Sequence, residues 1–327
     1  MNALYLDPGF GEARRRELLY DGQIFILSPT PSSKALCEFA EKMSRKAFGG
    51  LDPVRAHEHM PVEKYVEILA VLKPRFIHAP ESKRCIQGIL TETGCDPAQT
   101  HFDVPRLRTA SPFEYLRSGI AYAFQPHRDT WYSAPVSQLN WWMPVLEMQA
   151  GNAMAFHPRY WSRPLANSSR IYNYQTWNAN YRLAATTQVK TDTRPQPHAE
   201  EPVEMEPQLR LVIPAGSMII FSGAQLHSTV PNQTRDTRFS IDFRTVNAED
   251  AFAGRGAPNI DSQSTGTPLG DYLRATDLAQ FPPELIARYD GPNLRTKTAE
   301  APSLTSEPSV AEMPLGSKIK SAVGDAQ

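Results

Sequence analysis

Two well separated stretches of the chain hold residues whose types and spacing suit a metal site. The first contains His127 and Asp129, and the second contains His227 between two strand-like runs, among turn residues and small polar groups. On an extended chain, side chains at i and i+2 leave the same face, so His127 and Asp129 can reach one metal ion while Arg128 points the other way. Two imidazoles and one carboxylate, with positions left open for other ligands, form the facial triad that holds Fe(II). The sequence therefore predicts a metal site made by these three ligands.

Arginine and hydroxyl side chains near the last histidine suit an anion-binding group beside the metal. Arg238 lies eleven residues after that histidine, on the second strand-like run, and its planar guanidinium matches a carboxylate. Ser240 shares its strand face and adds a hydroxyl, whereas Thr229 is a weaker candidate. The alternative interpretation of Arg238 is a surface salt bridge. Arg235 and Arg244 are the nearest alternative assignments for the anion-binding role.

This order of residues resembles that of the 2-oxoglutarate and Fe(II)-dependent dioxygenases: a His-x-Asp pair, roughly a hundred residues, then a histidine and an arginine about ten residues later. More narrowly, the chain is similar to the phytanoyl-CoA dioxygenase-like branch, because residues 139–158 (LNWWMPVLEMQAGNAMAFHP) resemble that family's aromatic and apolar strand and its acidic turn. Residues 155–158 depart from the motif that ends this region in the family. The resemblance covers residues 121–247. A lone His-x-Asp pair is a weak signal, but four features in this order make a strong one.

The resemblance implies cofactors and a reaction. Fe(II) would bind to His127, Asp129 and His227. The cosubstrate 2-oxoglutarate would bind the iron through its keto and C1 carboxylate oxygens, and its distant carboxylate would bind Arg238. The implied reaction uses O2, decarboxylates 2-oxoglutarate to succinate and CO2, and removes hydrogen from an unactivated C–H bond. Hydroxylation is the default outcome, although desaturation, epoxidation and ring closure use the same triad, and the carboxylate of Asp129 disfavours a halogenase.

The tryptophan-rich run over residues 139–146 is expected to be a strand beside this site. Its alternation places Asn140 and Trp142 on one face, and these two residues with Gln138 are candidates for the barrel interior, where polar groups could contact the cosubstrate. The alternative is that the tryptophans only pack in the core.

Two other histidine motifs compete with the predicted ligands. His101 and Asp103 also form a His-x-Asp pair. However, the tryptophan-rich strand that follows the metal pair in the resembled family follows Asp129 here, and Asp103 leads into a strand-like run. His57 and His59 precede a helix and lack a third ligand at an informative spacing, which favours a solvated loop.

The elements that must position these residues indicate an α+β chain with a mostly β core. The expected elements are strands over 22–28, 84–90 and 101–110 and helices from Ser32 or Ser33 to 48 and over 61–72. Pro74 is expected to stop the second helix. The strand-rich middle favours a double-stranded β-helix, the jelly-roll or cupin-like barrel, with its core at about 84–247 and the N-terminal helices packed on the outside.

The segment 167–208 is expected to be an insert that covers the substrate, because long loops in compact domains are usually functional or disordered. The candidate substrate contacts are Tyr172, Tyr174, Trp177 and Arg182. Together with Arg163 and Arg170, Arg182 would suit a polar or carboxylated small molecule, such as an amino acid or a secondary metabolite. The acidic, proline-rich part, 191–207, is expected to be a mobile surface loop.

Composition excludes several classes of protein. The 327 residues include 34 basic and 35 acidic side chains, so the net charge of −1 gives no footprint for nucleic acid or an anionic membrane. Three scattered cysteines indicate neither a disulfide framework nor a zinc ribbon, and they favour the cytosol. No run approaches the roughly 18 apolar residues of a membrane helix. We expect one soluble domain over 1–290, a disordered tail over 291–327 and a small-molecule substrate, whereas the oligomeric state cannot be inferred from the sequence.

Two other functions are compatible with the motifs. A cupin-like barrel could hold a metal without oxidising anything, as an isomerase or a binding protein, but such a protein has no use for Arg238. A protein-modifying hydroxylase is the second alternative, in which the proline-rich loop would bind a protein partner.

Overall fold

The computed structural model describes residues 3–290, which form a mixed α/β fold around a large, mostly antiparallel sheet that does not close on itself. Its strands are, in order, β1 (Leu4–Leu6), β2 (Ile24–Leu27), β8 (Met218–Ser222), β5 (Leu139–Pro144), β10 (Arg238–Asn247), β3 (Thr100–Phe102) and β11 (Leu273–Arg274), with β4 (Arg106–Ala110) also paired to β10. Only β1 and β2 run parallel among the described strand pairs. The expected strands at 22–28 and 101–110 are confirmed.

A second, smaller sheet faces the first. It contains β7 (Leu209–Arg210), β6 (Met154–Phe156) and β9 (His227–Thr229), and an antiparallel bridge from His127 to His227 extends it by one residue. Trp142, Ile219 and Phe221 of the large sheet pack against Phe156 and Met154 of the small one. We call the face of the large sheet that carries Trp142 its inner face. The mixed architecture is confirmed, and closure into a double-stranded β-helix stays a prediction.

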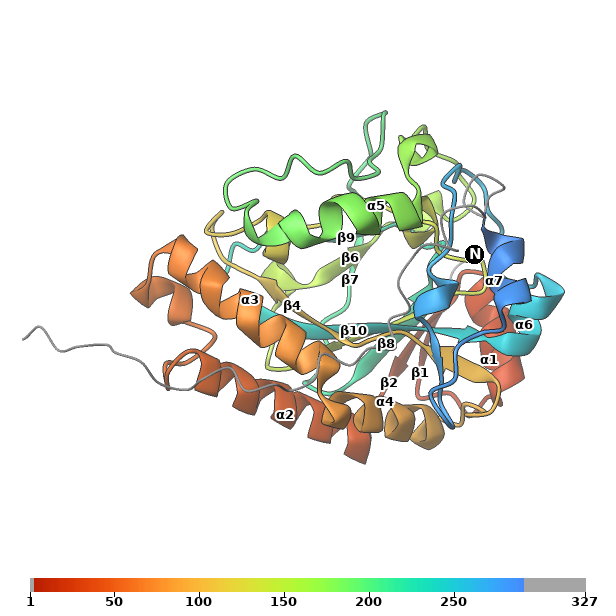
Figure 1. The fold of residues 1–327 in the computed structure, drawn as a ribbon, viewed down its shortest axis with the longest axis horizontal. Coiled ribbons are helices and arrows are strands. Elements are labelled where there is room, and N and C mark those ends of the chain that lie inside the picture. Colours follow the sequence, from red (N-terminus) through yellow and green to blue (C-terminus); the bar gives the residue numbers. More distant parts are fainter. Residues whose placement is uncertain (1–2, 291–327) are drawn as a thin grey trace, which may run out of the picture. The chain divides into compact units, whose positions relative to one another are not determined.

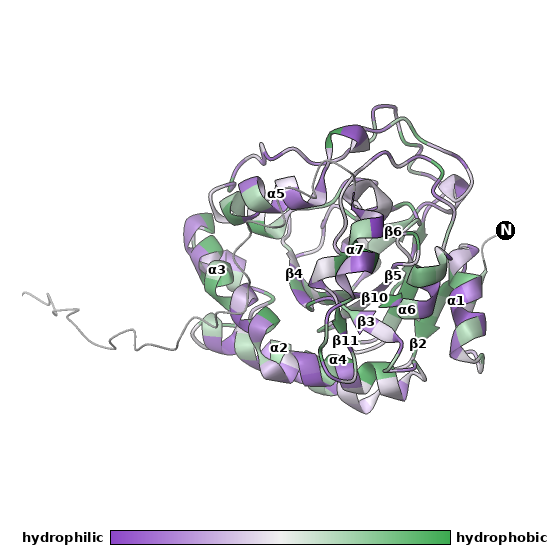
Figure 2. Ribbon diagram, turned by 45° about the vertical axis from the view of Figure 1, so that its right-hand side comes forward, coloured by the Kyte–Doolittle hydropathy of each residue, from purple (hydrophilic) through white to green (hydrophobic). Residues whose placement is uncertain are grey.

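Three helices cover the outer face of the large sheet. They are α2 (Pro31–Ala47), α3 (Val62–His78) and α4 (Pro80–Glu92), and their buried residues join Trp141, Ile220 and Phe243 in one core. Figure 1 shows α2 and α4 beneath the large sheet and α5 (Tyr174–Tyr181) on the opposite side, above the small one. Figure 2 shows hydrophobic and hydrophilic residues mixed along α2 and α3, as expected for helices buried on one side. The expected N-terminal helices therefore do pack outside the sheet.

Three local predictions were wrong. Residues 84–90 are not a strand, because Pro80 begins α4 and Ile86, Ile89 and Leu90 form a buried stripe at helical spacing. Pro74 lies inside α3 and does not end it, since Phe76 continues the buried face of the helix and its packing offsets the lost backbone hydrogen bond.

The third wrong prediction is the start of α2. Its N-cap is Thr30 and not Ser32 or Ser33. The Thr30 side chain accepts a hydrogen bond from the backbone of Ser33, and the Ser33 side chain accepts one from the backbone of Thr30, which is a capping box with Pro31 as the first helical residue.

The remaining helices lie at the edges of the sheets. They are α1 (Glu12–Tyr20), α6 (Ala248–Ala253) and α7 (Pro283–Tyr289). Within residues 3–290, no helix combines the length and the apolar composition needed to cross a membrane. The tail expected over 291–327 lies outside the described residues, and the single domain over 1–290 stays a prediction.

Candidate metal centre

His127, Asp129 and His227 meet between the two sheets. All three are buried, and their ligand atoms lie within 4.8 Å of one another. The Asp129 Oδ1 atom is 3.5 Å from His127 Nε2 and 3.8 Å from His227 Nε2. Reciprocal backbone hydrogen bonds of 3.0 Å pair the two histidines, and the Asp129 N–H donates to the Gly223 carbonyl at 2.9 Å. Asp129 begins a 3-10 turn, Asp129–Tyr132, so the expected extended chain ends at Arg128.

Both imidazoles are oriented by a backbone carbonyl two residues earlier. Nδ1 of His127 lies 2.8 Å from the Gln125 carbonyl, and Nδ1 of His227 lies 3.0 Å from the Gln225 carbonyl. A carbonyl only accepts, so each Nδ1 carries the proton and donates it, which leaves the Nε2 lone pair directed at Asp129. Burial, followed by the proximity of His127, lowers the pKa of His227 to about 3, so that its ring is neutral at pH 7.

The carboxylate of Asp129 is held by its other oxygen. Gln138 donates to Oδ2 at 3.0 Å, and Arg244 Nε lies 3.5 Å from the same atom. Burial alone would raise the pKa of Asp129, but its interactions with His127 and Arg244 hold that pKa below its usual range. Two neutral imidazoles and an ionised carboxylate are the donor set that a divalent metal such as Fe(II) requires, so these residues fit the predicted ion.

Gln138 links Asp129 to residues further from the metal ligands. Its Nε2 also donates to Asn140 Oδ1 at 2.9 Å, and its Oε1 accepts from the Tyr272 hydroxyl at 2.8 Å. Asn140 was expected to contact a cosubstrate, and here it contacts the group that orients Asp129. Partners of this kind fix ligand orientation in metal sites.

Arg128 points away from its two neighbouring ligands, as predicted. Its side chain is fully buried, and it pairs with Asp261 at 3.0 Å. It also donates to the carbonyls of Ala224, Tyr160 and Arg163 at 2.6, 2.5 and 3.1 Å. Ala224 belongs to the same turn as Gly223, so Arg128 ties the two ligand-bearing segments to each other and to a distant loop.

Arg238 is buried on the inner face of β10 and is not a surface residue. Its Nη1 donates to the Asn152 carbonyl at 2.7 Å, and its guanidinium lies 5.4 Å from the centre of the Trp142 ring. Within residues 3–290 it has no carboxylate partner, and its Nε has no hydrogen bond. Burial lowers the pKa of Arg238 to about 10. A buried cation without an ion pair of its own is unfavourable, and Asp242, whose charge acts on Arg238, is already paired with Arg108, so this group suits an anionic ligand.

The other candidates for anion binding differ in their surroundings. The Ser240 hydroxyl is fully buried on the same face and makes no hydrogen bond within the described residues. Thr229 lies on β9, and its backbone N–H donates to Phe124 at 2.9 Å. Arg235 is exposed and pairs with Glu58, and Arg244 pairs with Asp103. The surface salt-bridge interpretation of Arg238 is therefore wrong, and Ser240 is the hydroxyl best placed to assist it.

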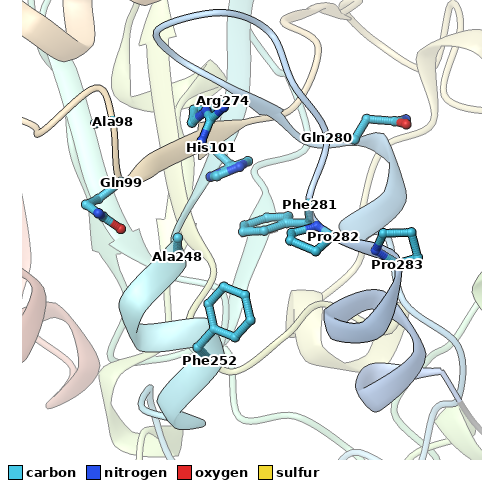
Figure 3. A pocket seen from close by; sticks show the side chains of 10 residues that line it. All are labelled: Ala98, Gln99, His101, Ala248, Phe252, Arg274, Gln280, Phe281, Pro282 and Pro283. Atoms are coloured by element: carbon cyan, nitrogen blue, oxygen red, sulfur yellow. The ribbon is translucent and has the colours of Figure 1, made fainter.

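The competing histidine motifs have structural roles. Asp103 binds Arg106 and Arg244 and accepts from the Arg244 backbone at 2.7 Å. His101 stacks on Phe281 with ring centres 3.7 Å apart, in a pocket of about 540 Å³ that no predicted ligand lines (Figure 3). His57 Nδ1 contacts the Thr237 hydroxyl at 3.1 Å.

Aromatic rings extend from His127 to the expected substrate-covering segment. Phe124 stacks on His127 at 4.8 Å, and Tyr132 packs edge-on to the same ring at 5.5 Å. Tyr132 contacts Tyr172, and Tyr172 contacts Trp177, at 5.3 and 6.1 Å. Phe124 and Tyr132 were not among the predicted site residues, although both flank the His-x-Asp pair closely in sequence.

The remaining candidates in this segment have separate partners. The Tyr174 hydroxyl donates to Asp271, and the Trp177 indole donates to the Pro195 carbonyl at 2.9 Å. Arg163 and Arg170 pair with Glu204 and Glu200 on the surface. Arg182 begins a 3-10 turn, Arg182–Thr186, and is exposed. The mobility expected for 191–207 stays a prediction.

Comparisons with known proteins leave the family open. No protein-family model matches the sequence, and no curated protein matches it. Solved structures that resemble the chain include non-heme oxygen-using enzymes and a 2-oxoglutarate-dependent epimerase. One is EvdO2 from Micromonospora carbonacea var. aurantiaca complexed with 2-oxoglutarate, at 16% identity over 73% of this chain and 92% of that chain, with a TM-score of 0.42.

Two further structures are similarly distant. The epimerase SnoN, in complex with Fe3+, alpha ketoglutarate and nogalamycin RO, is 12% identical over 72% of this chain and 85% of its own, with a TM-score of 0.36. AviO1 from Streptomyces viridochromogenes Tue57 is 12% identical over 77% of this chain and 100% of its own, with a TM-score of 0.37. Because these likenesses are loose, the function of the chain must be argued from its own side chains.

Proposed function

We propose that the chain is an Fe(II)- and 2-oxoglutarate-dependent oxygenase that acts on a small molecule. The observation that carries the proposal is the combination of a buried two-histidine, one-carboxylate group with Arg238, a buried guanidinium that forms no ion pair within residues 3–290. A metal-binding isomerase or storage protein would use the three metal ligands but would have no use for Arg238. The narrower likeness to phytanoyl-CoA dioxygenases and the barrel closure belong to this proposal.

Each residue of the site has a role in binding or orientation. His127 and His227 would bind the metal through Nε2, because their Nδ1 protons are committed to carbonyls. Asp129 would bind through Oδ1, because Gln138 and Arg244 hold Oδ2. Three ligands on one side leave adjacent positions for a bidentate 2-oxo acid and O2.

Arg238 and Ser240 would bind the distant carboxylate of 2-oxoglutarate. A planar guanidinium matches a carboxylate, and the unpartnered Ser240 hydroxyl adds a donor on the same strand face. When bound, Fe(II), 2-oxoglutarate and O2 supply the oxidising chemistry, in which the cosubstrate becomes succinate and CO2 and an unactivated C–H bond is attacked. Phe124 and Tyr132 pack around His127 and limit the access of water to that side. Hydroxylation is the default outcome we propose, and the carboxylate of Asp129 disfavours halogenation.

An anaerobic titration with Fe(II) and 2-oxoglutarate tests this function. The wild-type protein should develop a weak visible metal-to-ligand charge-transfer band. Arg238→Ala should weaken 2-oxoglutarate binding about a hundredfold or more, because a buried charge pair is lost. Arg235→Ala is the matched control, since that arginine is exposed and paired with Glu58. A wild-type protein without the band, or an undiminished band in Arg238→Ala, would contradict the proposal.

A further inference from the structure

The inner face of the large sheet carries a cluster of charges beside the metal ligands. Arg106 and Arg108 of β4 lie in register with Asp242 and Ser240 of β10, and Arg244 follows Asp242 on the same face. The residues between these charged ones, such as Leu107 on β4 and Ile241 on β10, point to the other face and belong to the core beneath the helices. Charged side chains thus occupy the face that a two-sheet protein would ordinarily fill with apolar residues.

Apart from the proposed metal ligand Asp129, this cluster holds three guanidinium groups and two carboxylates. Asp242 is shared by Arg108, at 2.6 Å, and Arg244, at 3.6 Å. Asp103 is shared by Arg244, at 3.1 Å, and Arg106. Three arginines therefore divide two carboxylates, and the remaining acid near Arg244 is the proposed metal ligand. When Asp129 binds a metal, the three guanidinium groups carry one positive charge more than Asp103 and Asp242 neutralise.

Some of the guanidinium nitrogens in this cluster have no hydrogen-bond partner within the described residues. Arg108 uses Nε and Nη2 on Asp242, and its Nη1 has no partner within residues 3–290. Arg106 uses only Nη1, for Asp103 and the Val104 carbonyl. The side chains of Arg108 and Arg106 are 34% and 21% exposed although they project between the sheets and the covering segment. Solvent therefore reaches unused donors on this face.

The cluster lies within reach of the proposed metal. The Arg108 guanidinium is 5.6 Å from the centre of the Phe124 ring, and that ring stacks on His127 at 4.8 Å. A small molecule bound to Arg108 would therefore be long enough to lie along Phe124 and reach the metal site at His127.

The covering segment adds another unpaired cation. Arg182 has no carboxylate partner in the described part of the chain, unlike Arg163 and Arg170, which bind surface glutamates. Burial raises the pKa of Tyr172 and Tyr174, and the nearby charge of Arg182 opposes that rise at both tyrosines, as the charge of Arg106 does at Tyr174. Arg182 and Arg106 thus approach the same tyrosine from the covering segment and from the sheet.

We infer that the substrate is an anionic small molecule, whose carboxylate or phosphate group binds Arg106, Arg108 and Arg182 while an apolar body lies along Phe124, Tyr132 and Tyr172 toward the metal. This inference rests on the proposed function. The arginines supply forked donors for an oxyanion, and the aromatic rings supply the apolar wall. Because Arg238 is buried whereas Arg106 and Arg108 are partly exposed, the cosubstrate and the substrate would use different cations.

Matched pairs of ligands test the inference on the full chain, loaded anaerobically with Fe(II) and saturating 2-oxoglutarate. The probes are 3-phenylpropionate against its methyl ester and benzyl phosphate against benzyl alcohol, with binding measured by calorimetry. We expect the anionic member of at least one pair to bind at least tenfold more tightly than its neutral partner. The pair that responds distinguishes a carboxylate from a phosphate. Equal binding within both pairs, or no anion binding up to millimolar concentration, would overturn the inference.

Variants separate this inference from the function on which it rests. Arg182→Gln and Arg108→Gln should each weaken binding of the anionic probe about tenfold or more and leave the neutral probe unchanged. Arg170→Gln, on the same segment and paired with Glu200, should change neither. The charge-transfer band must persist in Arg182→Gln. If the band forms but the anionic probe binds unchanged in both variants, the substrate inference fails alone; if the band never forms, the proposed function fails.

Discussion

The two faces of β10 contrast sharply in composition. The residues directed toward the helices are Phe239, Ile241 and Phe243, and all are buried in the main core. The residues directed inward are Arg238, Ser240, Asp242 and Arg244, which include the proposed anion-binding groups and the ion pairs beside the candidate metal ligands. One strand therefore separates stability from chemistry by its two-residue period. The outer face should be sensitive to a loss of side-chain volume, and the inner face should be sensitive to a loss of charged side chains.

The largest effect should come from the inner side, at Asp129. Asp129→Ala removes the only carboxylate among the predicted ligands, so we expect bound iron and succinate release to fall to background while the fold persists. The measurement is metal content after Fe(II) reconstitution, with circular dichroism to follow folding. Asp103→Ala is the control, because it removes the competing His-x-Asp acid; it should lower stability and keep the iron. Iron that survives Asp129→Ala and is lost from Asp103→Ala would reverse the assignment.

The outer face should show the opposite behaviour at Phe243. This side chain is fully buried and stacks on Trp141 with ring centres 5.4 Å apart. Phe243→Ala should lower the free energy of unfolding by about 3–5 kcal/mol, because a cavity replaces the ring. Iron affinity per folded molecule should stay within a factor of two of wild type, as the ring points away from the ligands. A chemical denaturation series and a metal titration measure the two quantities, and a large loss of iron affinity would show that the faces are not independent.

Lys73 is an exception to the contrast between an apolar outer face and a charged inner face, because it places an ionisable group on the outer side. It lies in α3, is buried, and donates to the Ile120 carbonyl at 2.6 Å and to the Thr109 hydroxyl at 3.3 Å. Burial, with the nearby charge of Arg108, lowers the pKa of Lys73 to about 7 from 10.5. Since the folded-state pKa lies below the unfolded one, the unfolded chain binds the proton more tightly, and stability is lost as the pH falls from about 10.5 to about 7.

Lys73→Met should remove that pH dependence. The variant should gain stability relative to wild type as the pH falls through this window, by on the order of 2–4 kcal/mol, with no further change below it. Denaturant unfolding at several pH values gives the difference. Lys64→Met is the control, since Lys64 lies on the same helix but is exposed and paired with Glu67. If the difference in unfolding free energy between Lys73→Met and wild type did not vary with pH, Lys73 would stay charged in the folded protein. The outer face would then hold a buried cation.

The sequence predicted which three candidate ligands come together better than it predicted what orients them. His127, Asp129 and His227 could be found because ligand chemistry restricts residue type and spacing. Arg128 could be expected to point away from them, but its partner Asp261 is more than a hundred residues distant and no local pattern indicates it. The carbonyls of Gln125 and Gln225 leave no sequence signal at all, because any residue supplies a carbonyl.

The same limits explain the errors in the fold. Alternating charge on β4 resembles a solvent-exposed strand, so Arg106 and Arg108 were not among the predicted site residues. Ile86, Ile89 and Leu90 suit a strand by composition, whereas their helical spacing, the start at Pro80 and the packing of α4 against α2 favour a helix. Residue type predicted the chemistry of this chain, whereas tertiary contacts decided which residues support it.

The smallest expected effect concerns the hydrogen bonds that lead from Asp129 to the sheet. Gln138→Leu removes the donor to Asp129 Oδ2 and should weaken iron binding by about 10–100-fold, as loss of such partners usually does. Tyr272→Phe removes only the hydroxyl that holds Gln138, one bond further away, so its effect should be several times smaller. Competition titrations with a chelator measure both affinities. The order of the two losses in iron affinity matters more than their sizes. If Tyr272→Phe weakened iron binding as much as Gln138→Leu, the orientation of Asp129 would depend on the position of β5 as a whole and not on a single donated hydrogen bond.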